Sequence, residues 1–176
     1  GAGRHRAPVI LAGMRPIINL DEVVLERFSH GERFETQDGA IGPQLGARQL
    51  GYSLNVVPPG KRAVPFHCPH AIEGLSLGLG GGGAVRIGER GPAIRKGAAT
   101  AAPAGGRASA HQIINTSAHE LRYLSVSTML PTDVIEYPDS GKVAVMVGSP
   151  PGEDPAARTY NHRGRPGPAL DYWDGE

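Results

Sequence analysis

The sequence contains one cysteine, no long apolar run and almost no net charge, at +1. A single cysteine excludes an internal disulfide and fits a reducing compartment. No stretch of 18 apolar residues is present, so a transmembrane helix is not expected. The balanced charge offers no basic surface for nucleic acid or for a membrane. Since the first residues also lack an apolar segment of signal-peptide length, these absences favour a cytoplasmic protein.

Glycine and proline, by contrast, are abundant, with 26 and 16 copies in 176 residues. They separate short apolar runs in the way that turns separate strands, which is typical of an all-β chain. The runs recur at intervals of roughly 8–12 residues, which indicates a sandwich or a barrel. They occupy residues 52–57, 71–79, 84–88, 92–100, 109–117, 121–128 and 143–148.

The composition divides the chain into three parts. Residues 1–40 are expected to form a loose arm and a first strand or short helix, the helix around residues 20–27. Residues 41–148 carry the regular strand pattern and are expected to form the barrel. Residues 149–176 are rich in proline and glycine, include the only tryptophan, and are expected to be irregular. Because aromatic residues in such a tail usually pack on something, we expect it to contact the barrel or a partner subunit.

Potential metal ligands cluster in the stretch PFHCPHAIEG, residues 65–74. His67, His70 and Glu73 lie there, and His111 lies on a later expected strand. Neutral imidazoles and carboxylates are the usual ligands of Zn, Fe, Mn and Ni. Ligands from adjacent strands could meet inside a small barrel and leave coordination positions open for substrate. The alternative for His67 and His111 is a pair of interior histidines that form hydrogen bonds and bind no metal.

Two spaced motifs resemble those of the cupin superfamily. In the first, Gly60 is followed by six residues and His67, and Glu73 is followed by six residues and Gly80. The second consists of Gly97, Pro103, Gly105, His111 and Asn115. The flanking sequence is similar to single-domain bacterial cupins that are loosely described as sugar-phosphate-isomerase-like. The resemblance implies an all-β jelly-roll barrel, often dimeric, with metal ligands at His67, position 69, Glu73 and His111.

Proline occupies position 69, so the second implied ligand is missing from its expected place. His70 is the obvious substitute, but side chains alternate between the two faces of a strand, and His70 would point away from His67. A β-bulge at Pro69 could turn His70 inward, because proline is tolerated at bulges. Either Pro69 forms the bulge that delivers His70, or it marks a site that has lost a ligand.

Several further residues are candidates for a substrate pocket. Tyr123 and Ser125 share one face of the expected strand 121–128, and Gln112 follows His111. Arg86 could hold an anionic group of a substrate. The glycine-rich stretch 74–83 indicates either a wider cavity or a slacker strand, since glycine weakens strands.

Two functions from different classes fit these features. The first is a metalloenzyme that acts on a small soluble metabolite, with the isomerase or dioxygenase chemistry that the resemblance implies. A divalent metal would polarise or bind the substrate, and Glu73 would serve as a ligand or as a general base. The alternative is a non-catalytic barrel that binds a small molecule at a degraded metal site. We also expect a homodimer, because the edge strands of an open barrel need cover.

Overall fold

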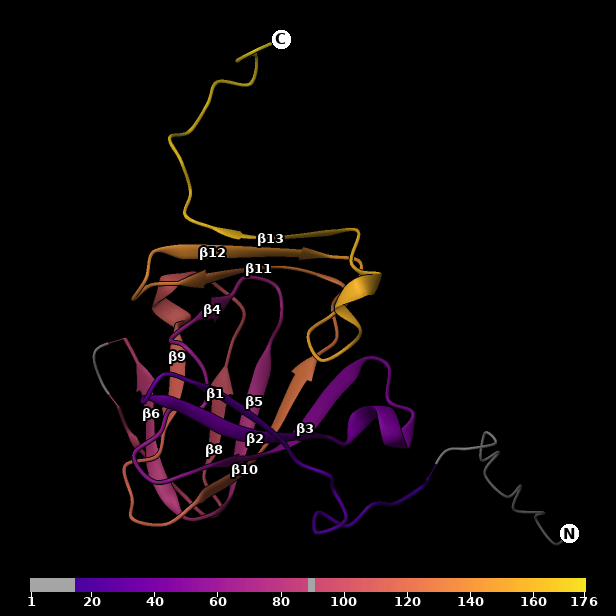
Figure 1. The fold of residues 1–176 in the computed structure, drawn as a ribbon, viewed down its shortest axis with the longest axis vertical. Helices are drawn as coiled ribbons and strands as arrows, with labels where there is room; N and C mark the ends of the chain where they lie inside the picture. The colour runs from indigo at the N-terminus through magenta and orange to yellow at the C-terminus, as the bar shows by residue number, and fades with distance from the viewer. Residues whose placement is uncertain (1–14, 89–90) are drawn as a thin grey trace, which may run out of the picture.

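The structure, a computed structural model, describes residues 15–88 and 91–176, so residues 1–14 of the expected arm lie outside the described part. Within these residues it is all-β, with three short 3-10 helices and no α-helix. The strands pair antiparallel and close into a jelly-roll barrel, as Figure 1 shows. No helix in the described ranges has the length and apolar character needed to span a membrane.

The largest sheet has six strands in the order β1-β2-β3-β10-β5-β8. Their bounds are Glu26–His30, Phe34–Ala40, Leu50–Val57, Leu121–Thr128, Gly74–Gly80 and Ala99–Ala102. β10 pairs along its whole length with β3 and along most of it with β5, which makes it the central strand of this wall.

Two smaller sheets complete the structure. The three-stranded sheet has the order β7-β6-β9, with bounds Ala93–Arg95, Gly82–Ile87 and His111–Ile114. The four-stranded sheet has the order β13-β12-β11-β4, with bounds Tyr160–Gly164, Lys142–Val147, Thr132–Tyr137 and Cys68–Pro69. The 3-10 helices are η1 (Gly42–Leu45), η2 (Arg107–Ser109) and η3 (Pro155–Ala157).

The expected strand pattern is confirmed in the barrel. Of the first strand or short helix expected before residue 40, the structure has the strand, and the segment after residue 149 is more regular than expected. The segment considered for a helix leads into β1 instead. β1 is a strand because the turn at Gly31, with a φ of 55°, lets Glu26–His30 pair with β2. β2 in turn pairs with β3, so no boundary separates arm from barrel at residue 40. The segment after residue 149 contains η3 and β13, which pairs with β12. Pairing with an existing edge gives these short segments a structure that their own sequences do not specify.

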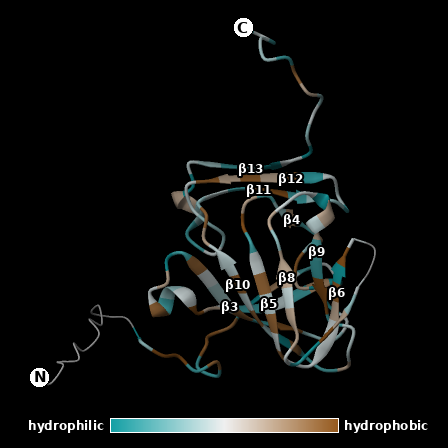
Figure 2. Ribbon diagram, turned by 180° about the vertical axis from the view of Figure 1, so that it is seen from behind, coloured by the Kyte–Doolittle hydropathy of each residue, from teal (hydrophilic) through white to brown (hydrophobic). Residues whose placement is uncertain are grey.

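The main hydrophobic core of the barrel borders the cavity that forms the candidate site. Its main cluster consists of Val57, Ala63, Val85, Ile94, Ile113, Leu121 and Tyr123. Figure 2 shows hydrophobic and hydrophilic residues interspersed along the barrel strands, and the members of this cluster are the buried ones. Three members of the cluster, Ala63, Ile113 and Tyr123, also line the barrel cavity.

Several glycines of the stretch 74–83, among them Gly81 and Gly83, have a packing role. A Cβ on Gly83 would collide with the carbonyl oxygen of Ile114 and lie 3.0 Å from Leu121. Gly81 has a φ of 70°, and a Cβ added there would collide with the carbonyl oxygen of Glu120. These glycines allow neighbouring chain segments to approach more closely than any side chain permits.

We expect Gly83→Ala to lower the free energy of unfolding by about 1–3 kcal/mol, because the new methyl group overpacks a backbone contact. Gly80→Ala is the matched control: no atom lies within 4 Å of the added Cβ. It should leave stability unchanged or raise it slightly, by up to about 1 kcal/mol, since alanine restricts the unfolded chain. Urea unfolding of both variants measures the difference, and equal stabilities would contradict the packing role of Gly83.

Candidate functional site

A cavity of about 290 Å³ lies inside the barrel. Its polar wall carries two histidines from neighbouring segments, several hydroxyl groups and amides, while much of the remaining wall is apolar. The polar lining residues are Asn55, His67, Ser76, His111, Gln112, Tyr123, Ser125, Ser127 and Asp133. The apolar ones include Val64, Pro69, Ile72, Leu75, Ile113, Val126 and Ile135. None of the lining residues is a lysine or an arginine.

The two histidines form the centre of the site. Backbone hydrogen bonds of 2.9 and 3.2 Å join His67 and His111, and their ring centroids lie 4.6 Å apart. Nδ1 of His67 lies 2.9 Å from the carbonyl oxygen of Pro65, and Nδ1 of His111 lies 3.2 Å from that of Ser109. Because a carbonyl oxygen only accepts hydrogen bonds, each Nδ1 donates, and each Nε2 retains a lone pair.

Both imidazoles are held in the neutral form. The pKa of His67 is lowered to about 4, chiefly by burial and to a smaller extent by the neighbouring His111. Burial also lowers the pKa of His111. Two neutral rings with free Nε2 lone pairs can accept hydrogen bonds from a ligand or bind a metal ion.

The depressed pKa of His67 makes stability dependent on pH. Between pH 4 and the ordinary histidine pKa of about 6.5, the unfolded chain binds a proton that the folded chain excludes. The free energy of unfolding should therefore fall as pH is lowered through this window, by up to about 3 kcal/mol. Urea unfolding at pH 7 and pH 4.5 measures the change. His67→Gln should remove most of it, whereas His30→Gln, at an exposed site, should not.

Hydroxyl and amide groups surround the histidine pair. The buried phenol of Tyr123 has a raised pKa because of burial, so it stays a neutral hydrogen-bond donor. The amide nitrogen of Asn55 donates to the hydroxyl of Ser125 at 3.0 Å. Gln112 donates through Nε2 to the carbonyl oxygen of Val64 at 2.7 Å, and its buried Oε1 has no partner among the described residues. Three of the four expected pocket residues, Gln112, Tyr123 and Ser125, thus lie at the cavity wall.

The alternation of side chains along β4 decides between the two explanations of Pro69. Pro69 lines the cavity with His67, and its partner on β11, Ile135, lines it too. His70 points outward, where its Nε2 lies 2.9 Å from Oε1 of Glu136. The structure therefore contains no bulge that brings His70 to the histidine pair, and a proline stands in the position of the missing ligand.

Glu73 and Arg86 also lie away from the cavity. Glu73 is exposed and contributes only its backbone, exchanging hydrogen bonds with Thr128. Arg86 makes a bidentate ion pair with Asp139, at 2.7 and 2.9 Å. Its guanidinium lies 3.8 Å from the centroid of the Phe66 ring. The structure thus brings together His67 and His111 from the expected ligand set, and leaves out His70 and Glu73.

A second group of potential ligands lies on the outward face of β4. It consists of Cys68, His70 and Glu136, each of which has one potential ligand atom within 4.8 Å of those of the other two. This arrangement could hold a metal ion. Glu136 already accepts a hydrogen bond from Arg107 at 2.9 Å, and this contact, followed by that with His70, lowers the pKa of its carboxyl. Burial raises the pKa of the Cys68 thiol, which disfavours the thiolate that metals prefer.

Asp133 and Asn55 are among the residues of the site that were not predicted from the sequence. Asp133 accepts backbone hydrogen bonds from His70, Ala71 and Ile72 at 2.8–3.3 Å and so fixes the chain after β4. Asn55 orients Ser125. Neither residue belongs to a motif with a recognisable spacing, because each acts on residues more than 60 positions away.

Solved structures of similar shape include proteins of several activities. One is a provisionally assigned sugar phosphate isomerase from Acidithiobacillus ferrooxidans, with 25% identity, a TM-score of 0.66, and coverage of 72% of this chain and 81% of that one. Another is a sugar phosphate isomerase of the cupin superfamily from Silicibacter pomeroyi, with 19% identity, a TM-score of 0.71, and coverage of 91% and 94%. A third is a predicted oxalate decarboxylase from Thermotoga maritima, with 19% identity, a TM-score of 0.56, and coverage of 65% and 99%. No protein-family model and no curated protein matches the sequence.

Proposed function

Because this chain has the jelly-roll barrel of the cupin superfamily, we propose that it binds a small uncharged metabolite in the barrel cavity. The ligand would carry hydroxyl or carbonyl oxygens, as a sugar does. The cavity volume of about 290 Å³ lies at the small end of the range for ligand sites, which suits a compact molecule.

The observation that carries the proposal is the charge of the cavity wall. Its polar groups are neutral imidazoles, hydroxyls and amides, and no cation is present to offset a buried phosphate or carboxylate. The one acid, Asp133, is occupied by backbone N–H groups. Burying an unpaired anion in such a wall is strongly unfavourable, whereas a neutral hydroxyl finds both donors and acceptors. His67 and His111 would accept from the ligand, and Tyr123 would donate to it.

The residues present do not fit the four-ligand metal set that the family resemblance implies. Only His67 and His111 face the cavity, and catalytic sites commonly use three protein ligands. This supports the alternative of a binding barrel with a degraded metal site over a metal-dependent isomerase or dioxygenase.

A second candidate function follows from the histidine pair itself. Each Nδ1 is fixed by a backbone carbonyl, which is the arrangement that prepares Nε2 for a metal ion. A divalent metal held there would supply a Lewis acid for isomerase-type chemistry on a bound carbonyl. Elemental analysis of protein purified without a histidine tag tests this candidate. Near-stoichiometric metal that is lost in both His67→Ala and His111→Ala, and retained in His70→Ala, would favour it.

Calorimetric titration tests the main proposal with matched pairs of ligands, each a neutral sugar and its phosphate. We expect the neutral member to bind at least about tenfold more tightly, because the wall offers the phosphate no cation. His111→Gln and Ser125→Ala should weaken binding, whereas His70→Ala should not. Tighter binding of the phosphate would contradict the charge argument, and binding unaffected by the cavity variants would overturn the site.

A further inference from the structure

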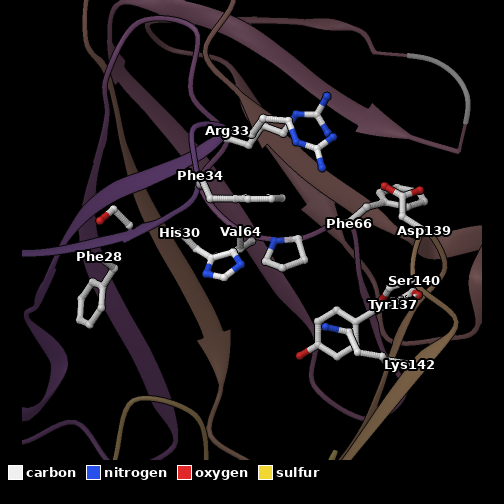
Figure 3. Close-up of a pocket in the computed structure, with 14 residues that line it drawn as sticks. Phe28, His30, Arg33, Phe34, Val64, Phe66, Tyr137, Asp139, Ser140 and Lys142 are labelled. Atoms are coloured by element: carbon white, nitrogen blue, oxygen red, sulfur yellow. Dashed lines mark hydrogen bonds between the residues drawn. The ribbon is translucent and has the colours of Figure 1, made fainter. Parts of the chain in front are cut away.

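A second, larger cleft of about 680 Å³ lies outside the barrel cavity. It is bounded by the β1–β2 hairpin, by residues 62–66 and by the β11–β12 hairpin, and Figure 3 shows the side chains gathered around it. Only Ala63 and Val64 border both hollows. The cleft therefore needs an explanation separate from the ligand proposed for the barrel.

The cleft combines aromatic rings with an excess of positive charge. Its aromatic residues are Phe28, Phe34, Phe66 and Tyr137, and its cations are Arg33, Arg62 and Lys142. Within the described residues, none of these three cations makes an ion pair. The one acid of the cleft, Asp139, makes a bidentate contact with Arg86 and also interacts electrostatically with Arg62 and Arg33, so that cations outnumber acids around it. An occupant of complementary chemistry would be aromatic and acidic.

The chain itself contains a segment with this chemistry. The tail, residues 165–176, ends in the sequence LDYWDGE and stands clear of the barrel in Figures 1 and 2. Leu170, Tyr172 and Trp173 are 74%, 84% and 71% exposed. Asp171, Asp174 and Glu176 supply three negative charges, which match the three free cations in number. Large apolar groups exposed side by side usually mark an interaction site.

The tail leaves the barrel at the rim of the cleft. Nε of Arg165 donates to the carbonyl oxygen of Ser140 at 3.1 Å, and Ser140 lines the cleft. Pro166 and Pro168 restrict their own backbone and that of the preceding residues to extended conformations. The tail is thus directed outward, away from the cleft beside which it starts. The nine residues from Arg165 to Trp173 are joined by eight steps and span roughly 25 Å when extended, enough to reach a neighbouring molecule.

We propose that the tail of a second copy of this chain docks in the cleft, so that two copies exchange tails about a twofold axis. Tyr172 and Trp173 would pack against the aromatic wall, and the acidic side chains would pair with Arg33, Arg62 and Lys142. When two clefts face each other, each tail starts beside its own cleft and lies over that of its partner. Such reciprocal contacts are those of a closed dimer. The inference is independent of the function proposed for the barrel.

The single tryptophan makes docking directly observable, because Trp173 alone reports on the tail. We expect its fluorescence emission to move to shorter wavelength as protein concentration rises. The shift should coincide with the monomer–dimer transition measured by sedimentation velocity. Raising the salt concentration should weaken both together, because the contacts are partly ionic.

Charge reversal tests the specific contacts. Arg33→Glu combined with Lys142→Glu should weaken dimerisation by about tenfold or more, and so should Asp171→Lys combined with Asp174→Lys. Arg48→Glu makes the same kind of change at an exposed site outside the cleft and should have little effect. Mixing the cleft variant with the tail variant should restore dimerisation, because the mixed dimer pairs the reversed cleft with the reversed tail and the unaltered cleft with the unaltered tail.

Three outcomes would overturn the inference. A blue-shifted emission that is independent of concentration in a monomer would mean that the tail folds back onto its own cleft. An exposed tryptophan in a stable dimer would mean that the copies meet through another face. A monomer with an exposed tryptophan at every concentration would leave the cleft to a small aromatic anion.

Discussion

Replacing Pro69 with histidine is expected to convert the histidine pair into a three-ligand metal site. Position 69 lies two residues after His67 on β4 and lines the same cavity, so the new imidazole should face His67 and His111. Three imidazoles are a sufficient protein ligand set for zinc. We expect Pro69→His to bind Zn²⁺ or Ni²⁺ stoichiometrically and roughly 100-fold more tightly than the unaltered chain, as measured by competition with a chelator.

Two further variants make this prediction specific. Pro69→Ala removes the proline without adding an imidazole and should not gain metal affinity. Adding His67→Ala to Pro69→His should abolish the gain. If Pro69→His binds metal no better than Pro69→Ala, the side chain at position 69 does not reach the pair.

Loss of the Asp133 carboxylate is expected to give a large decrease in stability. Asp133 is 2% exposed and accepts hydrogen bonds from the backbone N–H groups of Ala71 at 2.8 Å, His70 at 3.1 Å and Ile72 at 3.3 Å. His70 has a second acceptor in the carbonyl oxygen of Val134. Asp133→Ala would leave the N–H groups of Ala71 and Ile72 without this partner. Ile72 is buried, where an unpaired N–H costs about 1–3 kcal/mol, whereas water can partly replace the acceptor at the exposed Ala71. We expect the free energy of unfolding to fall by about 2 kcal/mol or more in urea.

Asp133→Asn and Asp154→Ala provide the comparison. Asparagine keeps one acceptor oxygen, so Asp133→Asn should lose less stability than Asp133→Ala. Asp154 also accepts a backbone N–H, from Ala156 at 2.9 Å, but in an exposed turn where water can replace it. Its loss should cost about 1 kcal/mol or less. Equal effects of Asp133→Ala and Asp154→Ala would show that the buried contacts of Asp133 contribute little.

Local patterns in the sequence were sufficient to predict the barrel, and the two motifs that resemble those of cupins placed His67 and His111 together inside it. Turn residues and apolar runs mark the strands, and the motif spacing brings the two histidines to neighbouring segments. The orientation of His70 was left open, since a bulge depends on the hydrogen bonds of the partner strand, which a single segment does not reveal.

The long-range contacts that orient side chains around the site could not be predicted from local sequence patterns. Arg86 was expected at the cavity, but its ion pair with Asp139, 53 residues away, holds it elsewhere. Glu136 meets His70 across 66 residues. The sequence left open whether the glycine-rich stretch widens the cavity or slackens the strand. The structure gives a third reason: several of these glycines lie so close to the backbone of distant segments that no side chain would fit.

The shortness of β4 has a consequence for how this wall could change. In the extended segment 67–70, which contains β4, His67 and Pro69 face the cavity, whereas Cys68 and His70 lie on the opposite face. Because side chains alternate, sliding the strand by one residue would exchange the sets and turn a thiol and an imidazole toward the ligand. Register alone therefore selects the chemistry of the wall, and the N–H groups held by Asp133 fix that register.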